Sequence, residues 1–236
     1  LKEGAKVIAK GAISVYVKNG RYSLNIKEIK VHGQGELYEK FLKLKEKLEK
    51  EGLFDDERKR PLPLFPKKIG VVTSPNGAAV KDILSVTERR YPYTHILIIP
   101  ALVQGGEEAV LSVISAIKAA NKIPDLEGLI VGRGGGSYEE LSLFNDERIA
   151  YTVFQSKIPI ISAVGHERDY TIIDFVADKR AATPSQAAEI IVPDKEDLTK
   201  KVENLFLRIE NRVFNLIYWA KNRLEACEPH KLKELF

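Results

Sequence analysis

One arginine stands among glycines directly after an apolar stretch, in the segment GLIVGRGGGS at 128–137. The glycines around Arg133 are Gly132, Gly134, Gly135 and Gly136. Because glycines have no Cβ atom, their backbone N–H groups can point inward and form a concavity for an anion. The guanidinium of Arg133 adds a planar, permanently charged set of donors that suits phosphate oxygens. We therefore expect this loop, including Ser137, to bind an anionic substrate. The alternative is a tight turn whose arginine lies in solvent.

A histidine directly after another apolar run is a candidate for proton transfer, in the segment AVGHERDYT at 163–171. The imidazole of His166 titrates near neutral pH and can move a proton at each end of a hydrolysis. Asp169 lies close enough along the chain to orient an imidazole nitrogen or to hold a metal ion. A single histidine is more often structural than catalytic. Here the charged neighbours of His166 and its place at the end of an apolar run favour catalysis.

A third polar segment, TSPNGAAVKDIL at 73–84, carries two further candidates. Ser74 lies in the loop after the first apolar run, and we include it among the substrate-binding candidates. Asp82 lies one or two turns into the helix that follows, where it either points back at the cleft or is a solvated carboxylate. Together with Asp169 it is a possible ligand of Mg²⁺, which binds through one or two carboxylates and water. Structural roles, as scaffold, surface or helix caps, are expected for Asp174, Asp178, Thr183 and Ser185.

Two nucleotide-binding motifs fit the sequence poorly. If the motif G-x-G-x-x-G is aligned with Gly132 as its first glycine, its third glycine is replaced by Ser137. This difference argues against a dinucleotide site. A P-loop is excluded, because no G-K-[ST] follows the glycines. Nucleotide binding therefore remains only a weak analogy.

The three polar segments all follow apolar runs that alternate with helical patterns. The runs are 68–74, 95–103, 126–132 and 158–165. Helical patterns separate them, beginning with a helix that we expect to open at Pro75. Such an alternation predicts an α/β fold with a mostly parallel sheet and helices on both faces. Right-handed crossovers would bring every strand's carboxyl end, and the loop after it, to one edge of the sheet.

Residues 1–35 read as the remnant of a separate β domain. Apolar and polar residues alternate there, and Asn19-Gly20 is a strong signal for a hairpin turn. Two strands are too few to form a stable sheet alone. A charged helix with an apolar stripe then opens the α/β domain at 36–193, and Gly52 marks its end. That stripe consists of Leu37, Phe41, Leu44 and Leu48.

The last part, 194–236, predicts a long helix. Residues 194–228 contain no glycine or proline. Apolar side chains recur there in alternating steps of four and three, a heptad seam that Arg223 interrupts and Cys227 resumes. The seam residues are Val202, Phe206, Ile209, Val213, Leu216 and Ala220. The pattern favours a protruding helix that pairs with another chain. The alternative is an amphipathic helix that packs on its own domain.

Composition sets broad limits on the class of protein. The chain has 236 residues, 44% of them hydrophobic and 30% charged, with a net charge of +4. This weakly basic balance is compatible with nucleic acid but does not require it. The single cysteine, Cys227, excludes an internal disulfide and suits the cytoplasm. We see no signal peptide and no apolar run long enough for a membrane span, and we expect a fragment because no methionine is present.

Three segments together resemble the large subunit of bacterial exonuclease VII. They are KKIGVVTSPNGAAVKDIL, VGRGGGSYEELSLFNDE and IPIISAVGHERDYTIIDFVADKRAATPSQAAE, and the likeness runs from residue 36 to about 193. In that family a nucleic-acid-binding OB-fold precedes the catalytic domain, and a long coiled coil that recruits small subunits follows it. The resemblance implies that 1–35 is the end of such an OB-fold and that 194–236 begins the coiled coil. It also implies an enzyme that degrades single-stranded DNA from both ends to short oligonucleotides.

The residues considered catalytic in that family correspond here to Asp82, Arg133, His166 and Asp169. The resemblance implies no strict need for a divalent metal, although Mg²⁺ bound by Asp82 and Asp169 stays open. One departure is Ser142, where the family usually has tryptophan. A non-catalytic module that binds single-stranded nucleic acid is the competing interpretation. Such a module would show exposed aromatic platforms in a basic groove.

Overall fold

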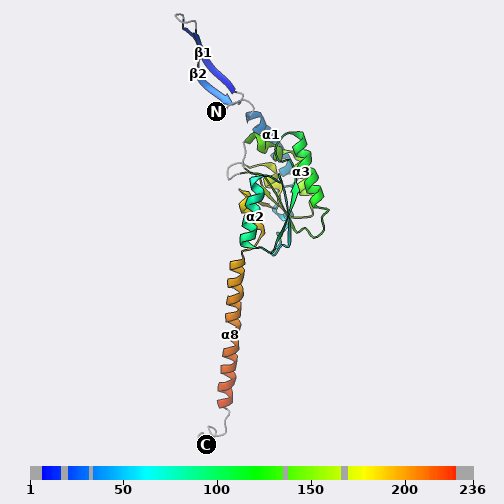
Figure 1. Cartoon of the computed structure of the whole chain (residues 1–236), viewed down its shortest axis with the longest axis vertical. Helices are drawn as coiled ribbons and strands as arrows, with labels where there is room; N and C mark the ends of the chain where they lie inside the picture. Colours follow the sequence, from blue (N-terminus) through cyan, green and yellow to red (C-terminus); the bar gives the residue numbers. More distant parts are fainter. Residues whose placement is uncertain (1–6, 17–20, 32–33, 135–137, 166–169, 227–236) are drawn as a thin grey trace.

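The computed structural model describes residues 7–16, 21–31, 34–134, 138–165 and 170–226. Helices and strands alternate through the central part, with a hairpin before it and a long helix after it (Figure 1). The strands are β1 (Val7–Tyr16), β2 (Arg21–Val31), β3 (Lys68–Thr73), β4 (His95–Pro100), β5 (Gly128–Gly132), β6 (Ile160–Ala163) and β7 (Lys179–Arg180). The α-helices are α1 (Gln34–Lys50), α2 (Ala78–Arg90), α3 (Glu107–Ala120), α4 (Tyr138–Leu141), α5 (Glu147–Phe154), α6 (Ile172–Val176), α7 (Pro184–Ile191) and α8 (Lys195–Ala226). Two short 3₁₀ helices are η1 (Asp56–Arg58) and η2 (Ser142–Asn145).

Within the described part of the chain, β3 to β7 form one sheet in the order β4-β3-β5-β6-β7. Every neighbouring pair in that sheet is parallel, which confirms the predicted α/β class. Four of these strands coincide with the four predicted apolar runs. The fifth, β7, was not predicted, because it has two residues and both are basic. Its pairing with β6 comes from tertiary contacts and not from an apolar run of its own.

Alternate side chains of the central strands enter two separate cores, because successive residues of a strand point to opposite faces. On one face, Ile69, Val71 and Ile130 pack in a core that α2 and α7 cover. On the other face, Val72 and Leu129 pack in a larger core that includes residues of α1, α3 and α5. Helices therefore cover both faces of the sheet, as the continuous apolar runs predicted.

The apolar stripe of α1 packs on the α/β domain as predicted. Phe41 and Leu48 are buried in the larger core, and Leu44 packs against it. Gly52 has a φ of 75°, a left-handed conformation that glycine adopts without strain, so the predicted end of the helix is confirmed. The start of the next helix was predicted too early. Helix α2 begins at Ala78 rather than at Pro75, after a turn in which Gly77 donates to the carbonyl of Ser74 at 3.0 Å.

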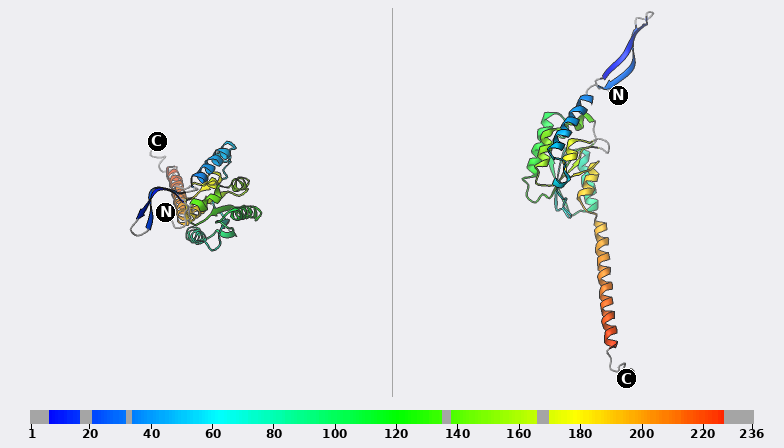
Figure 2. Two further views of the ribbon diagram at one scale, coloured as in Figure 1. Left: turned by 90° about the horizontal axis from the view of Figure 1, so that it is seen from above. Right: turned by 180° about the vertical axis from the view of Figure 1, so that it is seen from behind.

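The first two strands form the predicted antiparallel hairpin, with Tyr16 opposite Arg21. The Asn19-Gly20 turn falls outside the described residues. Large apolar side chains on the hairpin, such as Ile13 and Tyr22, are exposed. Figures 1 and 2 show this hairpin and α8 projecting from opposite ends of the α/β domain.

Helix α8 extends away from the domain over 32 residues, and none of them is buried. The seam residues are among the exposed ones, including Phe206 at 60% and Leu216 at 65% exposure. The alternative of a helix that packs along its own domain is therefore excluded for this structure. Among the described residues, no helix is both long enough and apolar enough to cross a membrane.

Candidate functional site

The strand order creates a crevice at the carboxyl edge of the sheet. Strand β3 has β4 on one side and β5 on the other, so the chain reverses direction across the sheet between β3 and β5. Helix α2 leaves β3 on one face and α3 reaches β5 on the other. Parallel sheets bind ligands at such a switch point, beyond the carboxyl ends of the strands.

A cavity of about 460 Å³ lies at this switch point. Three loops contribute to its wall, one after each of β3, β4 and β5. The lining residues are Thr73, Ser74, Gly77, Ala78, Leu102, Val103, Gln104, Arg133 and Gly134. Two of the three polar segments predicted from the sequence therefore meet in one cavity. The loop after β4, with Gln104, was not predicted as part of the site, because its first residues continue the apolar run 95–103 and it carries no charged side chain.

Arg133 lines this cavity but is itself buried, with 1% of its side chain exposed. Its Nη2 donates to Oε2 of Glu140 at 2.7 Å, and its Nε donates to the carbonyl of Gly134 at 3.0 Å. The alternative of an arginine in solvent is thus wrong. A carboxylate partner was not predicted, because Glu139 and Glu140 are indistinguishable in the sequence until the fold selects one.

The two described glycines beside Arg133 lie in different surroundings, one between strands and one at the cavity. Gly132 is the last residue of β5 and pairs with Ala163 of β6. A Cβ atom at this position would lie 3.0 Å from the carbonyl oxygen of Ala163, so close strand packing explains this glycine. Gly134 lines the cavity, and nothing lies within 4 Å of where its Cβ would be. Gly135, Gly136 and Ser137 lie outside the described residues.

Ser74 and Asp82, the candidates from the loop and helix after β3, have separate environments. Ser74 is half-buried and lines the cavity. Asp82 is exposed on α2, one turn beyond Ala78, and is not among the lining residues. His166 and Asp169 lie outside the described residues. No group of three His, Cys, Asp or Glu side chains that could hold a metal ion occurs in the described segments.

A buried carboxylate lies beside the carboxyl end of β6. Asp174 accepts hydrogen bonds from the Ser162 hydroxyl at 2.6 Å and from the backbone and hydroxyl of Thr171, each at 2.8 Å. Burial raises the pKa of Asp174, and the hydrogen bonds from Ser162 and Thr171 and the charge of Arg180 oppose that rise. We predicted that Asp174 is either a scaffold or a surface residue, and these contacts show that it is a scaffold residue.

Asp178 has a scaffold role of the same kind at the opposite edge of the sheet. Its Oδ2 accepts from the backbone N–H of Ile160, at the amino end of β6, at 2.6 Å. Its Oδ1 accepts from the backbone and from Nε of Arg60, at 2.7 and 3.0 Å. The cap predicted at Thr183 is also confirmed, because its side chain accepts from the N–H of Gln186 in α7.

Ser142, which replaces the tryptophan usual in the resembling family, lies away from the crevice. It begins η2 and lines a cavity of about 330 Å³ next to α1 and the start of α3. Phe41 and Val110 line the same cavity. Ser142 is therefore not among the residues that line the candidate site.

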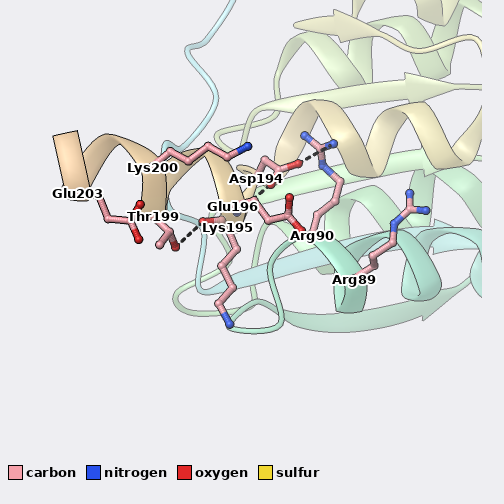
Figure 3. Close-up of a pocket in the computed structure, with 8 residues that line it drawn as sticks. All are labelled: Arg89, Arg90, Asp194, Lys195, Glu196, Thr199, Lys200 and Glu203. Carbon is pink, nitrogen blue, oxygen red and sulfur yellow. Dashed lines mark hydrogen bonds and ion pairs between the residues drawn. The ribbon is translucent and has the colours of Figure 1, made fainter.

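A larger cavity of about 680 Å³ lies where α8 leaves the domain (Figure 3). Its walls combine the last turn of α2 with the first two turns of α8. Because α2 runs from the carboxyl end of β3 back to the amino end of β4, this cavity is at the edge of the sheet opposite to Arg133. None of the candidate site residues lines it.

Comparison with known proteins agrees with the resemblance seen in the sequence. The family model described as "Exonuclease VII, large subunit" matches residues 53–235. A protein of Clostridium botulinum (strain Loch Maree / Type A3) named exodeoxyribonuclease 7 large subunit is 53% identical over 224 residues. That match covers 95% of this chain and 56% of the relative.

Two relatives of the same name come from other organisms. The protein of Brevibacillus brevis is 52% identical over 94% of this chain and 48% of its own length. That of Clostridioides difficile is 51% identical over 96% of this chain and 56% of its own length. This chain therefore spans about half the length of the curated relatives that it matches. Since the family model covers most of the sequence, the chain belongs to the exonuclease VII large-subunit family.

Proposed function

We propose that this chain carries the nuclease centre of an exonuclease VII and hydrolyses phosphodiester bonds of single-stranded DNA from both ends to short oligonucleotides. The observation that carries this proposal is the cavity at the switch point, with the buried guanidinium of Arg133 in its wall. Membership of the exonuclease VII large-subunit family supports it. The names of the relatives supply the type of bond and polymer, which the cavity alone does not specify.

In the proposed reaction, Arg133 and N–H groups of the glycine loop stabilise the charge that develops on the phosphoryl oxygens. Water attacks phosphorus and gives a proton to a general base. The bond from phosphorus to the leaving sugar oxygen breaks, and that oxygen takes up a proton. Electrostatic stabilisation of this kind is often the largest single contribution to catalysis. Ser74 and the glycine loop would hold the phosphate in the cavity.

We assign the proton transfers to His166, with Asp169 as the residue that orients its imidazole. An imidazole with a pKa near 6.5 can act as base and then as acid around neutral pH. Asp82 would either complete the hydrogen-bond network of His166 and Asp169 or bind a cation. Its exposure on α2 makes it the outermost of the proposed residues that the structure describes.

A divalent cation is proposed as an aid and not as a requirement. Mg²⁺ would bind through Asp82 and Asp169, together with water and phosphate oxygens. It would supply Lewis-acid stabilisation of the phosphoryl oxygens. Arg133 already offers a positive charge at the cavity, so a reaction that relies on His166 and Arg133 needs no ion for that purpose.

Digestion of single strands labelled at the 5′ or the 3′ end, with and without chelator, tests the proposal. The complete large subunit, assembled with its small subunit, should release short labelled oligonucleotides from both substrates. His166→Ala should abolish release, while Asp82→Asn should reduce it less, since asparagine still forms hydrogen bonds. Complete loss of activity in chelator, restored by Mg²⁺, would instead make the aspartates primary.

A non-catalytic module that binds single strands is the second candidate function. It predicts binding of labelled DNA without release of oligonucleotides. Exposed aromatic side chains such as Tyr22, Phe214 and Trp219 lie on the hairpin and on α8, which do not line the cavity. The described residues that do line it include no aromatic side chain on which a base could stack, which favours a catalytic cavity over a binding groove with stacking platforms.

We also propose roles for the two projecting elements. The hairpin of β1 and β2 would be the end of an OB-fold that delivers single-stranded DNA. The exposed seam of α8 would begin a coiled coil that binds the small subunits. The cytoplasm is the proposed location, because the single cysteine suits a reducing compartment.

A further inference from the structure

The loop after β4 forms an uncharged wall of the switch-point cavity. It contributes Leu102, Val103 and Gln104, whereas Arg133 comes from the loop after β5. Arg133 is the only charged side chain among the described residues that line this cavity. Leu102 is a large apolar side chain, yet it is 56% exposed. The cavity thus presents a cation from one loop and an exposed apolar side chain from another.

The loop after β4 is fixed to the domain on both sides of Leu102. Ala101 and Val103 are buried in the larger core. The N–H of Ala101 donates to the carbonyl of Thr73 at 3.0 Å, which continues the pairing of β4 with β3 beyond the strand. The N–H of Leu102 donates to Oγ of Ser112 in α3 at 2.9 Å. The fold therefore holds the backbone of Leu102 in place while its side chain remains exposed at the cavity.

A nucleotide of single-stranded DNA has two parts that match these two kinds of side chain. Its phosphate is an anion, which suits the guanidinium of Arg133. Its base is a flat ring whose faces are apolar, and in a single strand these faces are accessible. The wall with Leu102 offers apolar contact but no positive charge, so it suits a base better than a second phosphate. The amide of Gln104 can both donate and accept hydrogen bonds, so it can pair with the edge of any base.

We propose that Leu102 and Gln104 form a subsite for a nucleobase of the substrate strand, next to the phosphate that Arg133 binds. Leu102 packs on the face of the base, and the amide of Gln104 forms a hydrogen bond with its edge. This inference rests on the proposed function. Contact with the face of a base tolerates any sequence, because every base has such a face. It also favours single strands, since a base in a duplex is stacked between its neighbours.

Leu111 provides a matched control on the same part of the domain. It is a leucine of α3 that is 50% exposed, and it does not line the cavity. Leu111→Ala therefore removes the same atoms from a comparable surface position outside the subsite. Leu102→Met is the conservative variant, because methionine keeps an apolar side chain of similar volume. Both alanine variants should fold, since neither leucine is buried.

The experiment measures kcat/KM of the assembled enzyme on two labelled single strands of equal length, one with ordinary bases and one in which every residue is abasic. The wild type should prefer the ordinary strand by at least about fivefold. Leu102→Ala and Gln104→Ala should each lower kcat/KM about fivefold on the ordinary strand and leave the abasic strand unchanged, because the lost contact needs a base. Leu102→Met and Leu111→Ala should stay within about twofold of the wild type on both strands.

If the wild type cleaves the abasic strand too slowly to follow, the inhibition constant of that strand against the ordinary one provides the same comparison. Three results would overturn the inference alone while the wild type cleaves the ordinary strand. They are equal use of both strands by the wild type, an ordinary-strand kcat/KM that Leu102→Ala leaves unchanged or lowers no more than Leu111→Ala does, and equal losses of Leu102→Ala on both strands. The last would place Leu102 against the DNA backbone. A wild type that releases no oligonucleotides from the ordinary strand would instead overturn the proposed function and, with it, this inference.

Discussion

At the scale of single residues, the candidate site depends on charges that the fold has removed from water. Arg133 keeps 1% of its side chain exposed and pairs with Glu140, which is 45% exposed. Burying a charge is unfavourable unless it is paired and hydrogen-bonded, so the carboxylate of Glu140 explains how an arginine can lie inside the wall of a cavity. The same pair orients the guanidinium before any substrate arrives.

The first prediction concerns the guanidinium of Arg133. Arg133→Lys keeps the charge but cannot contact two phosphate oxygens in one plane, nor Glu140 and Gly134 as the arginine does. Activity on single-stranded DNA should fall by about 10²-fold or more. Arg58→Lys, the same change at an exposed arginine of η1 that does not line this cavity, serves as the control in the same assay. Near wild-type turnover in Arg133→Lys would show that the residue only attracts DNA by its charge.

The second prediction concerns the pH dependence that Asp174 adds to stability. Its pKa in the folded state is raised above the ordinary value of 3.8, so the folded protein binds this proton more tightly than the unfolded chain. Its contribution to the free energy of unfolding is therefore largest below pH 3.8 and declines as the pH rises through the raised pKa. Asp174→Asn cannot titrate and should lack this decline.

Urea unfolding of both forms at a series of pH values provides the measurement. The stability of the wild type relative to Asp174→Asn should decrease from acid towards neutral pH. An increase over that range would mean that the ion pair with Arg180 outweighs burial and lowers the pKa of Asp174.

At the scale of elements, the junction between the domain and α8 is defined by one aspartate. Oδ1 of Asp194 accepts from the N–H of Glu196 at 2.9 Å, which caps the first turn of α8. Oδ2 of the same side chain lies 3.3 Å from Nη1 of Arg90, in the last turn of α2 (Figure 3). The residue that caps α8 thus also connects the start of this helix to the end of α2.

The third prediction separates these two roles. Asp194→Ala removes the cap and the ion pair, whereas Asp194→Asn keeps a good capping side chain and removes only the charge. Loss of a cap costs about 1 kcal/mol, so amide exchange in the first turn of α8 should accelerate by about fivefold in the alanine variant. The asparagine variant should stay close to the wild type, because a partly exposed ion pair contributes little. Equal exchange in all three proteins would show that Asp194 is not a functional cap.

At the scale of the whole molecule, the α/β domain carries the core and both projecting elements lack one. No residue of α8 is buried, although a seam of large apolar side chains runs along it. The hairpin likewise exposes Ile13, Leu24 and Ile26. Exposed apolar surface of this extent usually marks contact with another chain or domain. The structure therefore consists of one packed α/β domain with exposed apolar side chains on each of its two projecting elements.

The fourth prediction concerns the seam of α8. Replacing Phe206 and Leu216 by glutamate should abolish association with a helical partner and leave the thermal unfolding of the α/β domain unchanged, since neither residue touches it. Sedimentation velocity measures the association. The control is the double change of Asn204 and Asn211 to glutamate, which adds the same charge on the face opposite the seam. Equal association of both variants, or unfolding of the domain by the seam variant, would contradict the prediction.

Local patterns were sufficient to predict the classes of element and much of the cavity. Continuous apolar runs identified β3, β4, β5 and β6 as buried strands, because a strand covered on both faces has no polar side. Parallel strands bring their carboxyl ends to one edge, so the meeting of Ser74 with Arg133 followed from the order of motifs. The heptad seam from Val202 to Ala220, in a stretch without glycine or proline, likewise predicted the protruding helix α8.

Tertiary structure alone decided which partners the charged residues have. Glu140 rather than Glu139 pairs with Arg133, and Arg180 lies beside Asp174 because a two-residue strand joins the edge of the sheet. Neither pairing has a periodic signal in the sequence, since it depends on how the chain between the two residues folds and not on their spacing alone. The burial of Arg133 also depends on the tertiary structure. Removing its charge from water is unfavourable, and the carboxylate of Glu140 in α4, seven residues further along the chain, offsets this by pairing with it.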